Sequence, residues 1–414
     1  MVLSIYAFFH INVFIINKTF YIFQFLLYII IQKYNPFNDI SDKNHSNSPS
    51  SPLKYNEHII NNLNKNNKKT VLLKGRMFLD KCLNGSNNKT YKANDNPSIT
   101  VIIPSFNCEK TIVSSINSVQ YQNFTNIEII IIDDFSIDST KNIIDNIRIN
   151  DKRIKFIQNN KNMGTLYSRC IGALLSQGSY ILSLDNDDLF FDEDVFDFLY
   201  KKIKNDNLDI VSFRALSFSN YFDKISAMKD YRFYGFKNNL FLSQHQLGIF
   251  PISLKKKFFI HDNEIWSKII KSKVYKKAVE LLGIERYRKY VCWAEDTNIN
   301  FIVFNIASSF KYSHKYGYIH IYRKTSATFV QKINNKLFGE LFFLDVMFDF
   351  LKNTSVKNYA ASYALKIRKK YFLKYSIIKE NKKYLKSILS KIIKSRYITA
   401  KNKKKLKFYF RNIL

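Results

Sequence analysis

The sequence predicts an α/β domain with a doubly wound, mostly parallel sheet between residues 97 and 330. Apolar runs of strand length alternate there with longer segments whose apolar residues have helical spacing. Acidic pairs follow two of these runs, although the whole chain carries a net charge of +32. Because ligands of doubly wound sheets bind at the carboxyl ends of the strands, we expect a ligand site where these acids gather.

Five apolar runs predict the strands, and the segments between them predict the helices. The runs cover residues 99–103, 127–132, 154–157, 180–184 and 210–213. Between them, apolar residues have helical spacing within 112–119, 143–147, 166–175 and 195–203. The connections are as long as parallel crossovers require. Continuous rather than alternating apolar strands indicate a sheet that is covered on both faces.

The pattern is weaker after residue 220. Residues 266–282 indicate a basic helix, in which Trp266 either belongs to the core, as we favour, or lines a ligand site together with Lys268. Residues 291–304 form a mostly apolar stretch that contains Glu295 and Asp296. From about residue 331 to 414 the spacing predicts helices.

Residues 1–33 predict a membrane anchor. They are almost wholly apolar, with Asn12, Asn17 and Lys18 as interruptions. Together their two halves reach the length of about 20 residues that a transmembrane helix needs. No small-residue cleavage site follows, so we expect a single-pass, uncleaved anchor rather than a signal peptide. An interfacial hairpin is the alternative.

Residues 34–96 are polar and rich in Asn, Lys and Ser, which indicates a stem or linker, with a helix predicted at 70–83. Lys33 and Lys43 favour a position of the following domain on the cytosolic side of the membrane. Asn-X-Ser/Thr sites at Asn84 and Asn88 point instead to the lumen of the Golgi or endoplasmic reticulum. The side of the membrane therefore stays open.

The C-terminal region, residues 331–414, concentrates positive charge. Residues 351–414 contain twenty Lys or Arg and one acid, a net charge of +19. Apolar residues repeat about every four positions from Tyr384 to Ile393, which predicts an amphipathic basic helix. Such a helix either packs on the body of the protein or lies on an anionic membrane surface. Its charge also attracts nucleic acid without sequence preference, but no motif for specific nucleic-acid recognition accompanies it.

The composition disfavours two classes of protein. The four cysteines are scattered, show no metal-ligand spacing and are too few for a disulfide framework in a chain of 414 residues, so we expect core thiols. The chain also lacks a glycine-rich phosphate loop that ends in Gly-Lys-Ser/Thr, which disfavours a P-loop enzyme.

Asp185 and Asp187 follow the fourth predicted strand and are one residue apart. Two carboxylates in this position can hold a hard divalent cation, which in turn can hold a diphosphate. Asp133 and Asp134 follow the second predicted strand, so both acidic pairs are expected at one edge of the sheet. An acidic loop that caps the next helix is the alternative interpretation of Asp185 and Asp187.

With these positions the sequence resembles the family 2 glycosyltransferases, which are inverting enzymes of the GT-A fold. The resemblance extends from about residue 98 to 328 and is strongest between 99 and 188. It rests on VIIPSFN at 101–107, DDFSIDST at 133–140, NMGT at 162–165 leading to SR at 168–169, DNDD at 185–188 and AED at 294–296. Each motif alone is weak, but all five occur in the family's order.

The resemblance implies a binding site for a nucleotide sugar. Pro104, Ser105 and Asn107 match the loop that lines the nucleoside pocket in the family. Asp134 matches the acid that contacts uracil, with helix capping as the alternative for the acidic pair. Arg169 matches an arginine near the nucleotide and diphosphate, with an ordinary surface helix position as the alternative.

Two further positions follow from the resemblance. Phe135 stands where the family usually has glycine, which leaves the geometry of that turn open. The segment HIYRKTS at 320–326 resembles a late family segment near the diphosphate, in which Arg323 is the candidate contact.

The resemblance also implies the metal and the catalytic base. Asp187 is expected to bind Mn²⁺ or Mg²⁺ directly. Asp185 is expected to bind the ion or the ribose, and the neighbouring Asn186 to contact the nucleotide sugar. Asp296 is expected to remove the proton of the acceptor hydroxyl, as an inverting transfer requires. Glu295 is the adjacent alternative.

These observations together predict a membrane-associated, metal-dependent inverting glycosyltransferase that uses a nucleotide sugar, most simply a UDP-sugar. The expected parts are an anchor at 1–33, a stem at 34–96, a GT-A domain at 97–330 and a basic helical region at 331–414. The acceptor, which is a lipid, glycan or protein, is left open. The alternatives are an inactive relative that binds nucleotide sugar or acts as a scaffold, and a basic nucleic-acid-binding protein.

Overall fold

The computed structural model describes residues 67–85, 87, 89–221, 224–231, 252–253, 258–259, 264–323, 332–350, 379–395 and 398–410. Residues 66–414 form one compact unit. The predicted anchor at 1–33 and most of the predicted stem lie outside the described residues. Among the described helices, none combines the length and the apolar character that crossing a bilayer would require.

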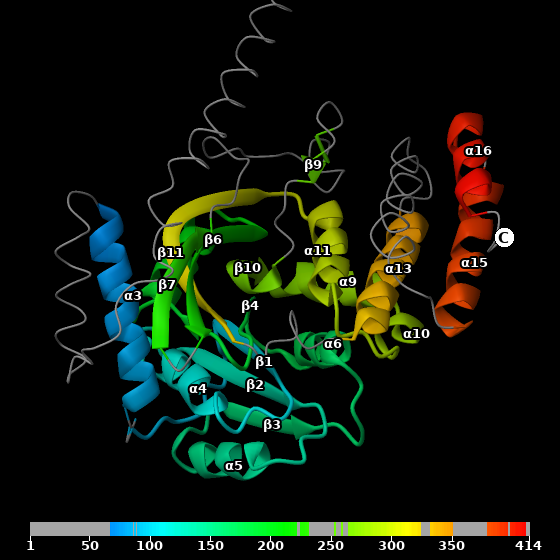
Figure 1. The fold of residues 1–414 in the computed structure, drawn as a ribbon. Helices are drawn as coiled ribbons and strands as arrows, with labels where there is room; N and C mark the ends of the chain where they lie inside the picture. Colours follow the sequence, from blue (N-terminus) through cyan, green and yellow to red (C-terminus); the bar gives the residue numbers. More distant parts are fainter. Residues whose placement is uncertain are drawn as a thin grey trace, which may run out of the picture. The chain divides into compact units, whose positions relative to one another are not determined.

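A sheet of nine strands forms the centre of this unit (Figure 1). Its first half is parallel, in the order β3-β2-β1-β4. These strands are β1 (Ile99–Ser105), β2 (Ile127–Asp133), β3 (Ile154–Gln158) and β4 (Tyr180–Ser183). All four were predicted to within two residues, because β1 and β2 are buried along their whole length and so have continuous apolar sequences.

The second half of the sheet makes it mixed, which corrects the prediction of a mostly parallel sheet. The order continues β10-β6-β11-β5, with β7 paired to β6. These strands are β5 (Leu189–Phe190), β6 (Ile210–Tyr221), β7 (Lys224–Tyr231), β10 (Lys268–Lys271) and β11 (Phe310–Tyr322). β10 runs antiparallel between β4 and β6. β8 (Ile252–Ser253) and β9 (Phe258–Phe259) form a separate pair.

β10 also corrects the helix predicted at 266–282. Residues Ile265–Ser267 form a 3₁₀ turn, η1, and the helix α9 starts only at Ser272. Ile269 and Ile270 are both buried because the strand has sheet neighbours on both sides and helices on both faces. Trp266 is 5 % exposed, which confirms its assignment to the core.

Helices cover both faces of the sheet, as predicted. Along β1, Val101 and Ile103 pack in one hydrophobic cluster, and Ile102 packs in the other. The first cluster includes residues of α4 (Ile112–Gln120), α5 (Thr140–Asn150) and α7 (Val195–Asn205). The second includes α6 (Thr165–Leu175), α9 (Ser272–Leu282), α10 (Ile284–Tyr287) and α11 (Glu295–Ile306).

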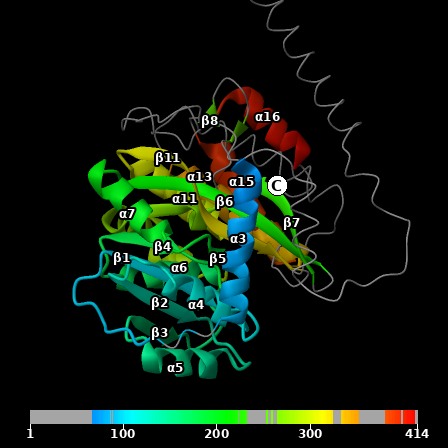
Figure 2. The same ribbon diagram turned by 90° about the vertical axis from the view of Figure 1, so that its left-hand side faces the viewer.

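The helix α3 (Asn67–Asn84) confirms the helix predicted at 70–83. It packs on α4, and Figure 2 shows it lying across that side of the sheet. Leu79 is buried, and Lys74 forms an ion pair of 2.9 Å with the buried Asp192. Part of the predicted stem therefore belongs to the packed unit.

The described C-terminal residues are helical, as predicted, and pack on one another. They form α13 (Ile333–Phe350), α15 (Lys379–Lys394) and α16 (Ala400–Tyr409). α13 contacts α11 on one side and α15 on the other (Figure 1). The apolar stripe of α15, including Leu385, Leu389 and Ile392, is buried in the core. Of the two roles predicted for this stripe, the structure shows packing on the body of the protein.

Candidate active site

Asp133 shapes the turn at the carboxyl end of β2. It is completely buried, and its carboxylate accepts hydrogen bonds from Ser105 Oγ at 3.1 Å, Ser136 N at 3.0 Å and Gln158 Nε2 at 2.9 Å. The carboxylate therefore ties the ends of three neighbouring strands, β1, β2 and β3, together. This explains an acid at Asp133 without any ligand.

The turn after Asp134 has the backbone geometry that glycine favours. Phe135 has a φ angle of 69°, and Asn107 in the facing loop has a φ of 46°. The two loops are joined, because Asn107 N donates to Ser136 Oγ at 2.9 Å and Ile137 N donates to Asn107 Oδ1 at 3.0 Å. Phe135 thus adopts the left-handed conformation at a cost of about 1–2 kcal/mol.

Asp134 connects β2 to the loop before α6. Its carboxylate accepts hydrogen bonds from Asn159 Nδ2 at 2.8 Å and from the backbone N–H groups of Met163 and Gly164, both at 2.7 Å. Gly164 has a φ of 88°, and a side chain there would come within 2.9 Å of the carbonyl oxygen of Val291. Asp134 thereby holds this loop against the segment that leads to Glu295.

The motif at 185–188 is fixed between β1 and β11. Asn186 Nδ2 donates to the Pro104 carbonyl at 3.0 Å. The Tyr318 hydroxyl accepts from Asp185 N and donates to Asp188 Oδ2, both at 3.1 Å. Asp188 Oδ1 accepts a further hydrogen bond from Ile321 N at 2.7 Å. The buried Asp188 is therefore a structural acid that orients the two acids before it.

The side chains of Asp185 and Asp187 are each 31 % exposed, so their carboxylates reach solvent. Arg323 Nη1 lies 3.3 Å from Asp187 Oδ2 and also donates to the Asp187 carbonyl. Burial and the charge of Asp188 raise the pKa of Asp187 to about 7, although Arg323 opposes this shift. Burial is the largest of these effects, and the charges around Asp187 act in both directions.

Arg169 joins the acids of the strand end to those of α11. Its side chain is 1 % exposed, with Nη2 2.6 Å from Asp185 Oδ1 and 4.0 Å from Glu295 Oε1, and Nε 3.1 Å from Asp296 Oδ1. Burial opposes the charged form of Arg169, but the carboxylates of Asp296, Asp185 and Glu295 outweigh it and raise the pKa. One buried cation thus holds three carboxylates from two distant segments.

Glu295 and Asp296 begin α11, where Ala294 adopts the left-handed conformation with a φ of 57°. Asp296 Oδ2 accepts a hydrogen bond of 3.2 Å from Ile265 N. Burial, together with the charge of Asp296, raises the pKa of Glu295 to about 8. Burial also raises the pKa of Asp296, against the effect of Arg169. Raised values are what a catalytic base near neutral pH requires.

A comparison with known proteins relates the first part of this arrangement to a known family. Residues 100–261 match the family model described as glycosyl transferase family 2. The chain carries a family 2 glycosyltransferase domain. The match begins in β1 and includes Asp134, Arg169, Asp185 and Asp187.

Curated relatives of this glycosyltransferase domain are named as glycosyltransferases. The chain is 27 % identical over 136 residues to glycosyltransferase GlyG of Streptococcus pneumoniae, which covers 33 % of this chain and 43 % of the relative. It is 41 % identical over 90 residues to the Escherichia coli UDP-Glc:alpha-D-GlcNAc-diphosphoundecaprenol beta-1,3-glucosyltransferase WfaP, covering 22 % of this chain and 35 % of the relative. The matches therefore span less than half the length of these relatives.

A solved structure extends the likeness of the fold. The crystal structure of S. aureus TarS in complex with UDP-GlcNAc aligns with a TM-score of 0.53 at 17 % identity, covering 76 % of this chain and 88 % of the TarS chain. This likeness supports the mixed α/β sheet as a GT-A fold, which the sequence resemblance implied.

The structure places the predicted nucleotide-binding residues of the glycosyltransferase domain at one edge of the sheet, but it buries several of them. Pro104 and Ser105 are buried, whereas Asn107 is exposed. Arg169 is buried and faces carboxylates, so the alternative of an ordinary surface helix position does not hold. The predicted contacts of these residues with a nucleotide stay predictions.

Sequence reasoning missed Tyr318, whose hydroxyl orients Asp185 and Asp188. The Trp266 ring stacks on the Tyr318 ring at a centroid distance of 4.4 Å. The His320 ring also stacks on the Trp266 ring, at a centroid distance of 5.8 Å. The sequence did not distinguish Tyr318 from its neighbours. The 13 residues of β11 contain five other tyrosines and histidines, any of which could have faced the site. Only the pairing of β11 with β5 selects Tyr318 among them.

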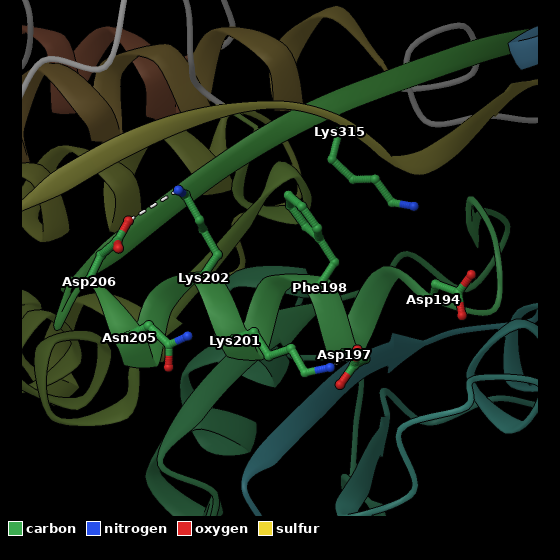
Figure 3. Close-up of a pocket in the computed structure, with 8 residues that line it drawn as sticks. All are labelled: Asp194, Asp197, Phe198, Lys201, Lys202, Asn205, Asp206 and Lys315. Carbon is green, nitrogen blue, oxygen red and sulfur yellow. Dashed lines mark hydrogen bonds and ion pairs between the residues drawn. The ribbon is translucent and has the colours of Figure 1, made fainter.

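A surface hollow of about 420 Å³ lies along α7 and is separate from the acids described above. Figure 3 shows Lys315 of β11 facing the helix across it. All three of its lysines are paired, Lys201 with Asp197, Lys202 with Asp206 and Lys315 with the buried Asp192. Because these pairs neutralise the lining, the hollow does not compete as a candidate active site.

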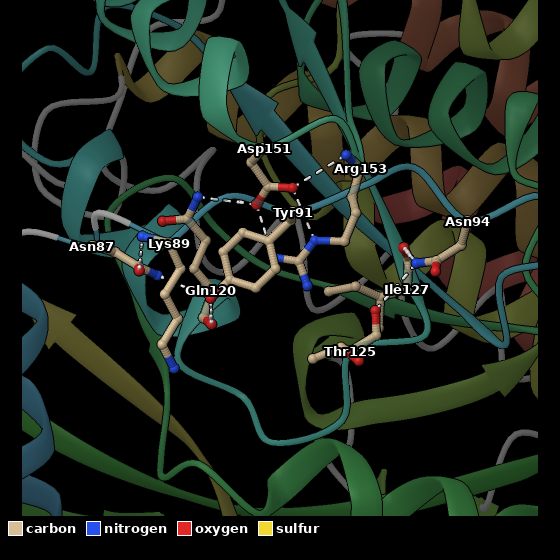
Figure 4. A network of polar contacts seen from close by, with 9 residues as sticks. All are labelled: Asn87, Lys89, Tyr91, Asn94, Gln120, Thr125, Ile127, Asp151 and Arg153. Carbon is tan, nitrogen blue, oxygen red and sulfur yellow. Dashed lines mark hydrogen bonds and ion pairs between the residues drawn. The ribbon is translucent and has the colours of Figure 1, made fainter.

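A second polar cluster fixes the chain before β1 to the edge of the sheet. The buried Arg153 binds Asp151 through Nε at 2.9 Å and Nη2 at 2.8 Å, and its guanidinium stacks on the Tyr91 ring at 3.6 Å (Figure 4). Gln120 Nε2 donates to Asp151 at 3.0 Å, and the Tyr91 hydroxyl donates to the Gln120 carbonyl at 2.7 Å. The two charges satisfy each other, so this cluster has a structural role.

Replacing Arg169 with alanine is expected to destabilise the fold strongly. The change leaves Asp185, Glu295 and Asp296 close together without their buried cation, which costs about 3–5 kcal/mol when a buried ion pair is broken. Urea denaturation of Arg169→Ala measures this loss. The control Arg148→Ala removes an exposed ion pair of 2.8 Å with Asp145 and is expected to cost at most about 1 kcal/mol. Equal losses in both variants would contradict the central role of Arg169.

Proposed function

We propose that this protein transfers a sugar from a UDP-sugar to a hydroxyl group of an acceptor, with inversion at the anomeric carbon. The observation that carries the proposal is the junction at Arg169, which joins Asp185 of the strand end to Glu295 and Asp296 of α11. A glycosyl transfer needs these two functions side by side: a group for the leaving diphosphate and a base for the acceptor. The names of the E. coli relative and of the TarS complex support a UDP-sugar as donor.

The donor would bind at the carboxyl ends of β1, β2 and β4. The exposed Asn107 and the loop held by Asp134 frame this edge. Asp134 has three hydrogen-bond donors on its carboxylate, and a carboxylate accepts about four. One acceptor position therefore remains for the ring N–H of uracil. Arg169 positions Asp185 in this proposal and does not touch the nucleotide itself.

The acids also fit a divalent cation. Among the described residues no three His, Cys, Asp or Glu side chains are arranged to hold a metal ion. Mg²⁺ and Mn²⁺ sites in enzymes of phosphate esters, however, use one or two carboxylates and complete the shell with water and substrate phosphates. The carboxylates of Asp187 and Asp185, whose side chains are each 31 % exposed, fit this donor set. Asp187 and Asp185 would hold the ion, which would offset the charge of the departing diphosphate.

The base is Asp296 in this proposal, with Glu295 as its neighbour. The carboxylate takes the proton of the acceptor hydroxyl while the oxygen attacks the anomeric carbon, and the bond to the diphosphate breaks on the opposite side. Ile265 N and Arg169 hold Asp296 by both oxygens, which fixes its orientation. The ion pair with Arg169 and the hydrogen bond from Ile265 N both oppose the rise of the Asp296 pKa that burial causes.

Residues 1–33 would anchor the enzyme to a membrane in this proposal. The support is their almost uninterrupted apolar sequence. A membrane association also suits a chain whose residues 351–414 carry a net charge of +19.

Replacing Asp187 with alanine is expected to reduce transfer at least about 100-fold, because the cation that offsets the leaving diphosphate loses a ligand. Transfer or hydrolysis of a panel of nucleotide sugars with Mn²⁺ measures the rate, and thermal stabilisation by UDP with Mn²⁺ measures binding. The matched control is Asp197→Ala, an exposed aspartate paired with Lys201, which is expected to keep both properties. A wild-type protein that binds UDP-sugar but transfers nothing would favour an inactive relative instead.

The value of kcat/KM is expected to rise with pH through a range above the usual pKa of an aspartate, and then to level off. A carboxyl group acts as a base only when it is ionised, and burial raises the pKa of the proposed base Asp296, although Arg169 opposes this shift. Each pH unit below the pKa then lowers the rate about tenfold. Asp296→Asn is expected to abolish transfer at every pH. Glu295→Gln is expected to stay active. Its kcat/KM is expected to rise at lower pH than that of the wild type, because a negative charge next to Asp296 is lost. The opposite behaviour of the two variants would make Glu295 the base.

A further inference from the structure

The outer face of α15 and α16 is covered with lysines. The exposed residues are Lys382, Lys383, Lys386, Lys394, Lys401, Lys404, Lys405 and Lys407. Residues 381–410 contain no aspartate or glutamate that would neutralise them within the two helices. Among the described residues these eight lysines form no ion pair, so their charge remains directed to solvent.

The packing of α15 determines which side chains face outward. Leu385, Leu389 and Ile392 are buried against the core. On the rim, Lys391 lies 2.8 Å from Asp345 of α13, and Tyr384 donates a hydrogen bond of 3.2 Å to the same acid. These contacts fix the rotation of α15 about its axis, so the remaining lysines cannot turn inward without losing the buried stripe.

α16 adds aromatic side chains to the same charged surface. Lys401, Lys404, Lys405 and Phe408 have the spacing that places them on one helix face. Phe408 is 64 % exposed and Tyr409 is 44 % exposed, whereas Leu406 and Phe410 hold the opposite side of the helix in the core. A lysine face that ends in exposed aromatic rings has the composition of helices that lie at a bilayer interface.

We propose that this lysine face of α15 and α16 docks on an anionic lipid membrane. Each lysine near an anionic leaflet strengthens binding by about fivefold at physiological salt. All eight charges are lysines, which act as point charges toward a diffuse surface, whereas specific phosphate recognition favours the planar guanidinium of arginine. This composition favours a membrane over nucleic acid. The docking does not depend on the proposed transferase activity.

The docked face is connected to the candidate active site through packed helices. α13 contacts α15 on one side and α11 on the other, and Gly339 of α13 lies against the backbone of Trp293, two residues before Glu295. A protein docked through α15 and α16 therefore holds the start of α11 at a fixed position relative to the membrane. This would suit an acceptor that is itself bound to the membrane.

Vesicle binding of the full-length chain tests the proposal. Partitioning is measured with neutral vesicles of phosphatidylcholine and with vesicles of equal parts phosphatidylcholine and phosphatidylglycerol, at low and high salt. An N-terminal anchor would contribute to binding of both vesicle types. The ratio of anionic to neutral vesicle binding therefore measures the contribution of the lysine face. The triple variant Lys401→Glu, Lys404→Glu, Lys405→Glu is expected to lower binding to anionic vesicles at least about tenfold, with no change for neutral vesicles.

The matched control changes three exposed lysines elsewhere in the unit, Lys92→Glu, Lys141→Glu and Lys152→Glu. It alters the net charge equally and is expected to lower binding less than about threefold. Circular dichroism confirms folding, and the milder set Lys401→Gln, Lys404→Gln, Lys405→Gln is expected to show an intermediate loss. Equal losses in the two glutamate triples would overturn the proposal. Unchanged vesicle binding in the variant with Glu at 401, 404 and 405 would also overturn the proposal. This holds whether or not the same variant loses binding to duplex DNA, which is measured alongside.

Discussion

A single buried guanidinium holds the two halves of the candidate active site together. Arg169 comes from α6, which follows β3 in the parallel half of the sheet. Its partners come from the end of β4 and from the start of α11, more than 100 residues later in the chain. A buried arginine is tolerated only where carboxylates replace its lost hydration. The position of α11 relative to the strand ends therefore depends on this charge balance as much as on apolar packing.

The hydrogen bonds of Asp134 act in parallel with Arg169. They hold the loop at 159–164 against Val291, so the segment before α11 is fixed from both ends. The hydroxyl of Tyr318, in β11, fixes the motif at 185–188 through its hydrogen bonds with Asp185 and Asp188. Three polar contacts, each with a buried partner, thus converge on the acids that a transfer reaction would use. Geometry of this kind is pre-organised, because little side-chain freedom is left to lose when a donor binds.

The sequence predicted the parallel strands and their crossover helices because burial on both faces leaves a continuous apolar run, as in 127–132. It could not predict β10. Residues 266–282 are basic and have helical spacing in their second half, and only the gap between β4 and β6 makes the first half a strand. The acids were found because strand ends share one edge of the sheet. The inward direction of Arg169 and the choice of Tyr318 depend on tertiary contacts that have no local signal.

The acids of the site outnumber their cations, and this excess must be relieved. Arg169 and Arg323 face Asp185, Asp187, Glu295 and Asp296, with Asp188 buried beside them. Burial, together with the neighbouring carboxylates, raises the pKa of Asp187 to about 7 and the pKa values of Asp188 and Glu295 to about 8, which favours their protonated forms. In the proposed function Asp185 and Asp187 would hold a divalent cation that relieves the same excess. Its binding would release protons, so that the affinity for the donor and its cation would increase with pH.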